Sequence, residues 1–92
     1  MISEGSMPEI SRFFGIIIRM FYDEHNPPHL HAEYRGGKAL IDFQGNVLRG
    51  SIESRTALRL IREWIDLHVG ELEANWELAR TGKEIKPVAP LD

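Results

Sequence analysis

The hydrophobic pattern of the chain changes its period at Ser54, and this change limits the possible folds more than any other feature. Before Ser54, an apolar run at residues 13–22 predicts a strand buried on both faces or nearly so, and short runs bounded by glycines and prolines follow it, in which apolar and polar residues alternate as in half-buried β-strands. After Ser54, apolar residues recur at the spacing of an amphipathic helix, and the Ser54 hydroxyl can cap the first turn. The sequence therefore predicts an α+β fold in which a sheet precedes its helices.

Four antiparallel strands are predicted, at residues 14–22, 29–35, 38–44 and 47–52. Gly36-Gly37 and Gly45-Asn46 form the two-residue turns of the last two hairpins. The first turn places Asp42 opposite His31, and the second places Arg49 opposite Asp42. One face of the sheet is then apolar, with Leu30, Ala32, Tyr34, Ala39, Ile41 and Phe43. The other face is mostly polar, with His29, His31, Glu33, Asp42, Gln44 and Arg49.

Two helices are predicted after Ser54, near residues 55–69 and 71–81, with a break at Gly70. One straight helix over that stretch would be about 40 Å long, which is more than so small a domain needs. Gly82 is suited to end the second helix, since glycine readily adopts the left-handed conformation found after a C-cap. The expected architecture is a four-stranded antiparallel β-meander packed on one face by two C-terminal helices, a two-layer sandwich.

The ordered domain is predicted to span residues 7–82. Residues 1–6 are interpreted as an N-terminal extension or the remnant of an expression tag. Residues 83–92 contain two prolines and are predicted to form an extended or loose tail. A domain of this size has one modest core, so stabilisation by a partner or by a second copy of the chain is compatible with the sequence.

Cysteine is absent from the 92 residues, which excludes disulfides, thiolate–zinc sites and cysteine catalysis. The longest apolar run, residues 13–22, is much shorter than the about 20 residues that span a bilayer. No secretory signal is recognisable at the start of the chain. We therefore expect a cytoplasmic protein.

Three of the four histidines lie within seven residues, in the stretch His25-Asn26-Pro27-Pro28-His29-Leu30-His31. His29 and His31 are two residues apart on one predicted strand, so their imidazoles project to the same side. The predicted register adds Asp42 opposite His31, and a carboxylate beside an imidazole selects its tautomer and raises its basicity. His25 could fold back over the Pro-Pro turn toward this pair. Further oxygen ligands or bases are Asp23 and Glu33.

Three interpretations of this cluster remain open. In the first, a metal such as zinc is held by His25, His29 and His31, or by His29 and His31 with a carboxylate. In the second, two histidines act as general acid and general base, for example in cleaving an RNA phosphodiester through the neighbouring 2′-hydroxyl. The residues that would then hold phosphate are Arg35, Lys38 and Arg49. In the third, these are polar residues on an exposed sheet face, and His31 with Asp42 is an ordinary cross-strand pair.

Several segments resemble a known family. They are residues 7–16 (Met-Pro-Glu-Ile-Ser-Arg-Phe-Phe-Gly-Ile), residues 23–31 with the HNPPHxH pattern, Ala57-Leu58-Arg59-Leu60 with Trp64, and Glu71-Leu72 with Asn75-Trp76. Over about residues 7–91 the chain resembles short bacterial proteins catalogued as a domain of unknown function, DUF4160. Such proteins are often encoded beside another small protein, in an arrangement resembling a toxin–antitoxin operon.

The resemblance implies a bacterial origin and a small cognate protein partner encoded nearby, but no established activity and no established catalytic residue. Together with the histidine cluster, it leads us to expect a toxin–antitoxin-type component that binds this partner. The component could be a ribonuclease that uses His25, His29, His31 and Asp42. The alternatives are a non-enzymatic protein-interaction module and a histidine-based metal-binding protein, so the sequence leaves open whether the chain is an enzyme.

Overall fold

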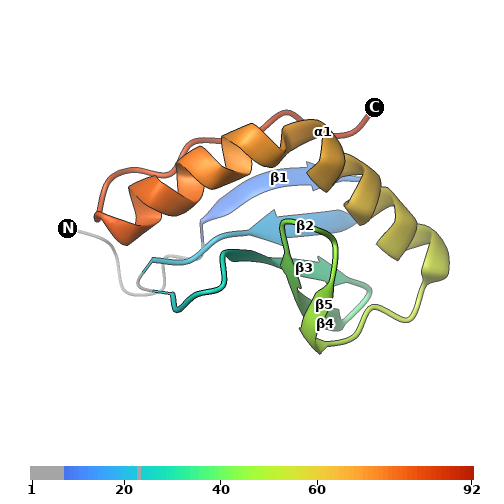
Figure 1. Cartoon of the computed structure of the whole chain (residues 1–92). Helices are drawn as coiled ribbons and strands as arrows, with labels where there is room; N and C mark the ends of the chain where they lie inside the picture. Colours follow the sequence, from blue (N-terminus) through green and yellow to red (C-terminus); the bar gives the residue numbers. More distant parts are fainter. Residues whose placement is uncertain (1–7, 23) are drawn as a thin grey trace.

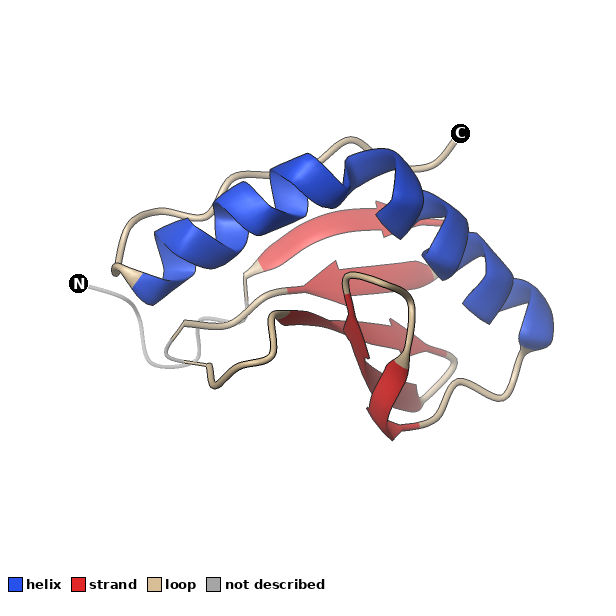
Figure 2. Cartoon of the chain, in the orientation of Figure 1, coloured by secondary structure: helices blue, strands red, loops and turns tan. Residues whose placement is uncertain are grey.

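The computed structural model describes residues 8–22 and 24–92, in which five strands form one antiparallel sheet and one long helix crosses a face of it (Figure 1; Figure 2). The strands are β1 (Glu9–Phe13), β2 (Ile16–Arg19), β3 (His29–Tyr34), β4 (Gly37–Asp42) and β5 (Val47–Gly50), and the helix is α1 (Arg55–Arg80). Each strand pairs with the next one along the chain. The predicted α+β class and antiparallel meander are confirmed, whereas the prediction of four strands and two helices is wrong.

The additional strand arises from a turn at Phe14-Gly15, which divides the apolar run predicted as one strand. Both residues have positive φ angles, 51° for Phe14 and 79° for Gly15, and the turn pairs Phe13 with Ile16. Two consecutive positive φ angles are typical of the tight hairpin turn whose twist matches that of its strands. Phenylalanine rarely adopts this conformation, so the composition of the apolar run did not indicate a turn.

The β3–β4 turn lies one residue earlier than predicted, at Arg35-Gly36, whose φ angles are 47° and 83°. Each cross-strand partner is therefore displaced by two positions. His29 lies opposite Asp42, and His31 lies opposite Leu40. The predicted pairing of His31 with Asp42 is wrong. Because side chains alternate with a period of two, however, a displacement of two positions keeps every residue on its predicted face.

A bulge between β4 and β5 changes the partner of Arg49. Leu40 pairs with Arg49, whereas Ile41 pairs with Val47, so the register shifts by one residue between these two pairs. The predicted pairing of Asp42 with Arg49 is therefore wrong. Arg49 lies instead in the same cross-strand row as Leu40.

The two predicted helices are one helix with a bend. His68 has non-helical backbone angles (φ −126°, ψ 20°), which kink α1 two residues before Gly70 without ending it. A straight helix of 26 residues would be about 39 Å long, whereas the longest dimension of the molecule is 36 Å. The kink thus lets α1 follow the curved sheet (Figure 1). Ser54 caps the helix as predicted, since its Oγ accepts a 3.1 Å hydrogen bond from the backbone N–H of Ala57.

The covered face of the sheet packs against the apolar stripe of α1. Trp64 is fully buried, and its ring lies 5.5 Å from that of Phe13 on β1. Trp76, on the same apolar stripe, is buried too. The buried strand residues at the centre of this layer are Leu30, Ala32, Ala39 and Ile41.

Residues 83–92 contain neither helix nor strand, and they pack closely beside α1 (Figure 1). The indole N–H of Trp64 donates to the carbonyl oxygen of Ala89 at 2.8 Å. The backbone N–H of Val88 donates to the carbonyl oxygen of Ile10 on β1, also at 2.8 Å. Because Ile85 and Val88 are buried, the tail is part of the core and covers the β1 edge of the sheet.

Candidate functional site

The face of the sheet that α1 does not cover, called the open face below, carries a row of side chains from four strands. Directly opposed residues share a face, and the pairing places Arg19, His31, Leu40 and Arg49 side by side across β2, β3, β4 and β5. His29 lies two residues from His31, on the same face of β3. The predicted polar face therefore exists, and it brings together two of the three clustered histidines.

Glu24 joins His29 and His31 in a group of three possible metal ligands. Glu24 lies in the connection that leads from β2 into β3. Its Oε1 is 2.5 Å from Nε2 of His31 and 3.5 Å from Nε2 of His29. All three atoms lie within 4.8 Å of one another. The β2–β3 connection and β3 thus bring three possible ligand atoms together.

His29 is held with one ring nitrogen aimed at this point. Its side chain is 5% exposed, and its ring packs 5.2 Å from the ring of Trp76. Nδ1 lies 2.8 Å from the carbonyl oxygen of Pro27, which can only accept, so Nδ1 carries the proton and donates it. In the neutral ring Nε2 is then the acceptor, and it has no hydrogen-bond partner within residues 8–22 and 24–92. This tautomer is the one found in histidines that bind a metal through Nε2.

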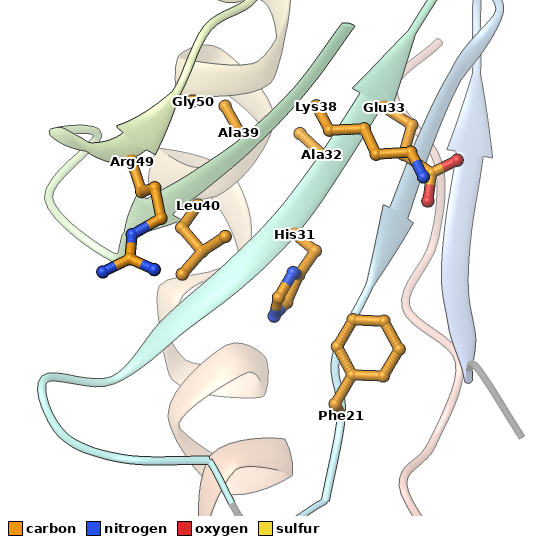
Figure 3. Close-up of a pocket in the computed structure, with 9 residues that line it drawn as sticks. All are labelled: Phe21, His31, Ala32, Glu33, Lys38, Ala39, Leu40, Arg49 and Gly50. Carbon is orange, nitrogen blue, oxygen red and sulfur yellow. The ribbon is translucent and has the colours of Figure 1, made fainter. Parts of the chain in front are cut away.

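His31 is half-buried and is oriented by two neighbours. Its Nε2 and Glu24 Oε1 form the 2.5 Å hydrogen bond. The ring of Phe21 meets its ring edge-to-face, with 4.3 Å between their centres. Figure 3 shows His31 between Phe21 and Leu40 on the open face of the sheet.

Two pockets of about 320 Å³ each open beside this group. The first is lined by Phe21, His31, Ala32, Glu33, Lys38, Ala39, Leu40, Arg49 and Gly50 (Figure 3). The second is lined by Glu24, His25, Asn26, Pro27, His29, Leu40, Leu48 and Arg49. Leu40 and Arg49 line both pockets, so Arg49 shares a pocket with each residue of the Glu24, His29 and His31 group.

His25 is exposed and does not belong to that group. It lines the second pocket together with Glu24 and His29. The three-histidine arrangement of His25, His29 and His31 is therefore not what the structure brings together. The other arrangement predicted from the sequence, His29 and His31 with a carboxylate, is the one observed, and its carboxylate is Glu24.

The carboxylate of Asp42 accepts hydrogen bonds from the β4–β5 connection. It does not pair with His31, as the sequence had predicted. It accepts hydrogen bonds from the backbone N–H groups of Gln44 and Asn46, at 2.9 and 2.8 Å, and from the Asn46 side chain at 3.1 Å. Burial acts to raise the pKa of Asp42, but the hydrogen bonds from Asn46, Gln44 and Gly45 outweigh it and hold that pKa below its usual value. Asp42 therefore stays ionised as a structural acceptor.

The remaining candidates are spread over the open face and its rim. Lys38 and Arg49 line the first pocket, whereas Arg35 lies at the β3–β4 turn with its guanidinium 5.1 Å from the centre of the Tyr34 ring. Glu33 forms a 2.8 Å ion pair with Arg19. Asp23 lies outside the described residues.

Glu24 is the functional candidate that sequence reasoning missed. It directly precedes His25 in the HNPPHxH segment, but it lies outside the strand whose period of two grouped His29 with His31. No periodicity fixes the direction of a side chain in such a connection. Its place in a motif that also contains both histidines was the available signal.

The donor set suits a borderline divalent metal. Two imidazole nitrogens and one carboxylate oxygen are ligands that zinc accepts, at about 2.0–2.2 Å from the ion. Tetrahedral geometry would separate the ligand atoms by about 3.4 Å, close to the 3.5 Å between His29 and Glu24. The shorter His31–Glu24 contact would have to open by about 1 Å as the ion replaced the shared proton.

Comparisons with known proteins identify one family. No curated protein and no solved structure matches the chain. Among the described residues, no helix is both long and apolar enough to cross a membrane. The family described as "Domain of unknown function (DUF4160)" matches residues 15–77, a segment that contains Glu24, His29, His31 and Arg49. As the match covers more than half of the sequence, the chain belongs to the DUF4160 family.

Proposed function

We propose that the protein binds one divalent metal ion of the zinc type through Glu24, His29 and His31. The observation that carries the proposal is the buried Nε2 of His29, which points toward the other two ligands and has no hydrogen-bond partner in the described part of the chain. A buried acceptor left unpaired costs about 1–3 kcal/mol. A metal at this point would satisfy it.

Three protein ligands are the number typical of catalytic zinc sites. Structural zinc sites usually have four protein ligands, whereas catalytic sites keep a position for water or substrate. An ion bound here would act as a Lewis acid toward whatever occupied that position. The pockets on both sides of Leu40 supply access to it.

The test is zinc titration of protein that has first been treated with a chelator. We expect one zinc per chain for the unmodified protein, and a strong loss of affinity in Glu24→Gln, His29→Ala and His31→Ala. His25→Ala is the matched control, because His25 lies in the same segment but outside the ligand group. Binding that is absent in the unmodified protein, or equally weakened by His25→Ala, would contradict the proposal.

A second candidate is metal-independent cleavage of RNA, which the short hydrogen bond between His31 and Glu24 favours. In such a pair the carboxylate orients the imidazole and selects its tautomer, as a general base requires. His25 would then be the second proton-transfer group, because it lines the neighbouring pocket. Cleavage that persists in excess chelator and disappears in His31→Ala would support this candidate. Cleavage that the chelator abolishes would instead indicate that the site acts through a bound metal.

A small cognate protein encoded nearby stays part of the proposal as the binding partner. Support comes from β5, which is exposed at all four residues and carries Val47 and Leu48 on the uncovered edge of the sheet. Such an edge can pair with a strand of another chain. Co-expression with the product of the neighbouring gene, followed by size-exclusion chromatography, should give a complex that Leu48→Lys weakens. Two separate peaks at micromolar concentration would contradict it.

A further inference from the structure

We infer that the ligand of this site is a small organic phosphate monoester. Its phosphate would lie between the metal ion and Arg49, and its apolar body would rest against Phe21 and Leu40. The inference depends on the proposed metal site and adds the chemical class of the molecule that the site recognises.

Arg49 is a cation placed for a ligand. Two other arginines on the same face, Arg12 on β1 and Arg19 on β2, each form an ion pair with a glutamate, at 2.7 and 2.8 Å. Arg49 has no carboxylate partner within residues 8–22 and 24–92, although it lines both pockets beside the proposed metal ligands. A guanidinium can donate two parallel hydrogen bonds to a phosphate, which makes it well suited to bind that group.

The charges around the site favour an anion. A divalent ion bound by two neutral imidazoles and one carboxylate keeps a net positive charge. Lys38 and Arg49 add two further cations to the first pocket, and the one carboxylate among the described residues that line it, that of Glu33, is paired with Arg19. A phosphate monoester carries about two negative charges at neutral pH and can therefore bridge the ion and Arg49.

The same pocket also has an apolar part, which a free phosphate ion would not use. The apolar side chains that line it on the open face are those of Phe21 and Leu40. Leu40 is an apolar residue on the open face, and it lies in one cross-strand row between His31 and Arg49 (Figure 3). A volume of about 320 Å³ is at the lower end of the range for small-molecule sites. The geometry thus places an apolar surface directly beside a site for a doubly charged group.

The test uses phenyl phosphate and inorganic phosphate as probes, with calorimetric titration of the zinc-loaded protein. We expect phenyl phosphate to bind more tightly than inorganic phosphate, and binding of both to require zinc. Arg49→Gln should weaken phenyl phosphate at least about tenfold, because a charge-assisted pair of hydrogen bonds is lost. Arg55→Gln should leave the affinity unchanged, since Arg55 is an exposed arginine at the start of α1.

Two variants test the apolar contact. Phe21→Ala should lower the affinity for phenyl phosphate more than the affinity for inorganic phosphate, and so reduce the advantage of phenyl phosphate. Since Phe21 also touches His31, Leu40→Asn provides a second variant that leaves the ring contact intact. Equal affinity for the two probes in the unmodified protein would overturn the apolar part of the inference.

The failure of this inference can be distinguished from failure of the metal site. A protein that binds no zinc overturns both. A protein that binds zinc but not phenyl phosphate, or whose Arg49→Gln variant binds phenyl phosphate as tightly, overturns only the ligand assignment. Equal binding of phenyl phosphate with and without zinc overturns the bridging position of the phosphate.

Discussion

The two faces of the sheet are made of alternate residues of the same strands, but different interactions hold them. On the covered face, Leu30 and Ile41 are fully buried under α1 and contribute through the removal of apolar surface from water. On the open face, His31 and Arg49 have no helix above them, and His31 is oriented by a few specific contacts. One face therefore stabilises the fold, and the other presents chemical groups in fixed positions.

The comparison shows why one alternation pattern can serve both purposes. Positions that alternate along a strand experience independent environments, because successive side chains point in opposite directions. The strands can thus keep a full apolar layer for stability while the intervening positions carry imidazoles and a guanidinium. His29 departs from this division, as does Asp42 opposite it, since His29 lies on the open face yet is buried against Trp76 of α1.

The largest difference between the faces should appear in truncation of leucines on paired strands. Leu30→Ala removes a fully buried side chain and should lower the free energy of unfolding by about 2–5 kcal/mol. Leu40→Ala removes a half-buried side chain of the open face and should cost about 1 kcal/mol. Urea denaturation of both variants measures the difference. Equal losses would mean that the open face is packed like a core.

The ligand group of the open face should increase the stability of the protein only when zinc is bound. At a free concentration one hundred times the dissociation constant, a ligand of the folded state alone raises the free energy of unfolding by about 2.7 kcal/mol. The unmodified protein and His25→Ala should both show this gain in thermal denaturation, whereas His29→Ala should show none. A similar gain in His29→Ala would place the ion elsewhere.

How far the sequence predicts each face depends on how many residues specify it. The covered face was predicted correctly because a whole layer of apolar residues alternates, and a turn displaced by one residue moves partners by two without changing faces. The exact partners were not predictable, because Arg35 and Phe14 adopt positive φ angles that non-glycine residues seldom do. The position of the kink at His68 likewise follows from packing on a curved sheet, not from local propensity.

The candidate site was only half predictable for a related reason. His29 and His31 share a strand, so the period of two placed them together. Glu24 reaches them from a connecting segment, and Asp42 turned away from them because a nearby turn offered its carboxylate several hydrogen-bond donors. Contacts made by connecting segments depend on the whole fold, so a single sequence does not determine them.

Asp42 should give a smaller effect, and one that depends on pH. Its pKa is lower in the folded chain than in the unfolded one, so the unfolded chain binds the proton more readily. The stability that Asp42 contributes is therefore fully present above the usual aspartate pKa of about 3.9 and is lost as the pH falls toward the folded value. Asp42→Asn should cost about 1–3 kcal/mol at neutral pH and should flatten this acid dependence. Unchanged acid sensitivity in urea titrations at pH 3–6 would contradict this role.

The smallest effect is expected from the Arg19–Glu33 ion pair of the open face. Both side chains are partly exposed, at 18% and 25%, so Glu33→Gln should lower the free energy of unfolding by only about 0.2–1 kcal/mol, and less at high salt. Glu77→Gln is the control, since its pair with Arg80 lies fully at the surface of α1 and should contribute even less. A loss of about 3 kcal/mol or more in Glu33→Gln is typical of a charge left buried without its partner. Such a result would contradict the distinction between a covered face and an open one, because it would mean that something covers both faces in solution.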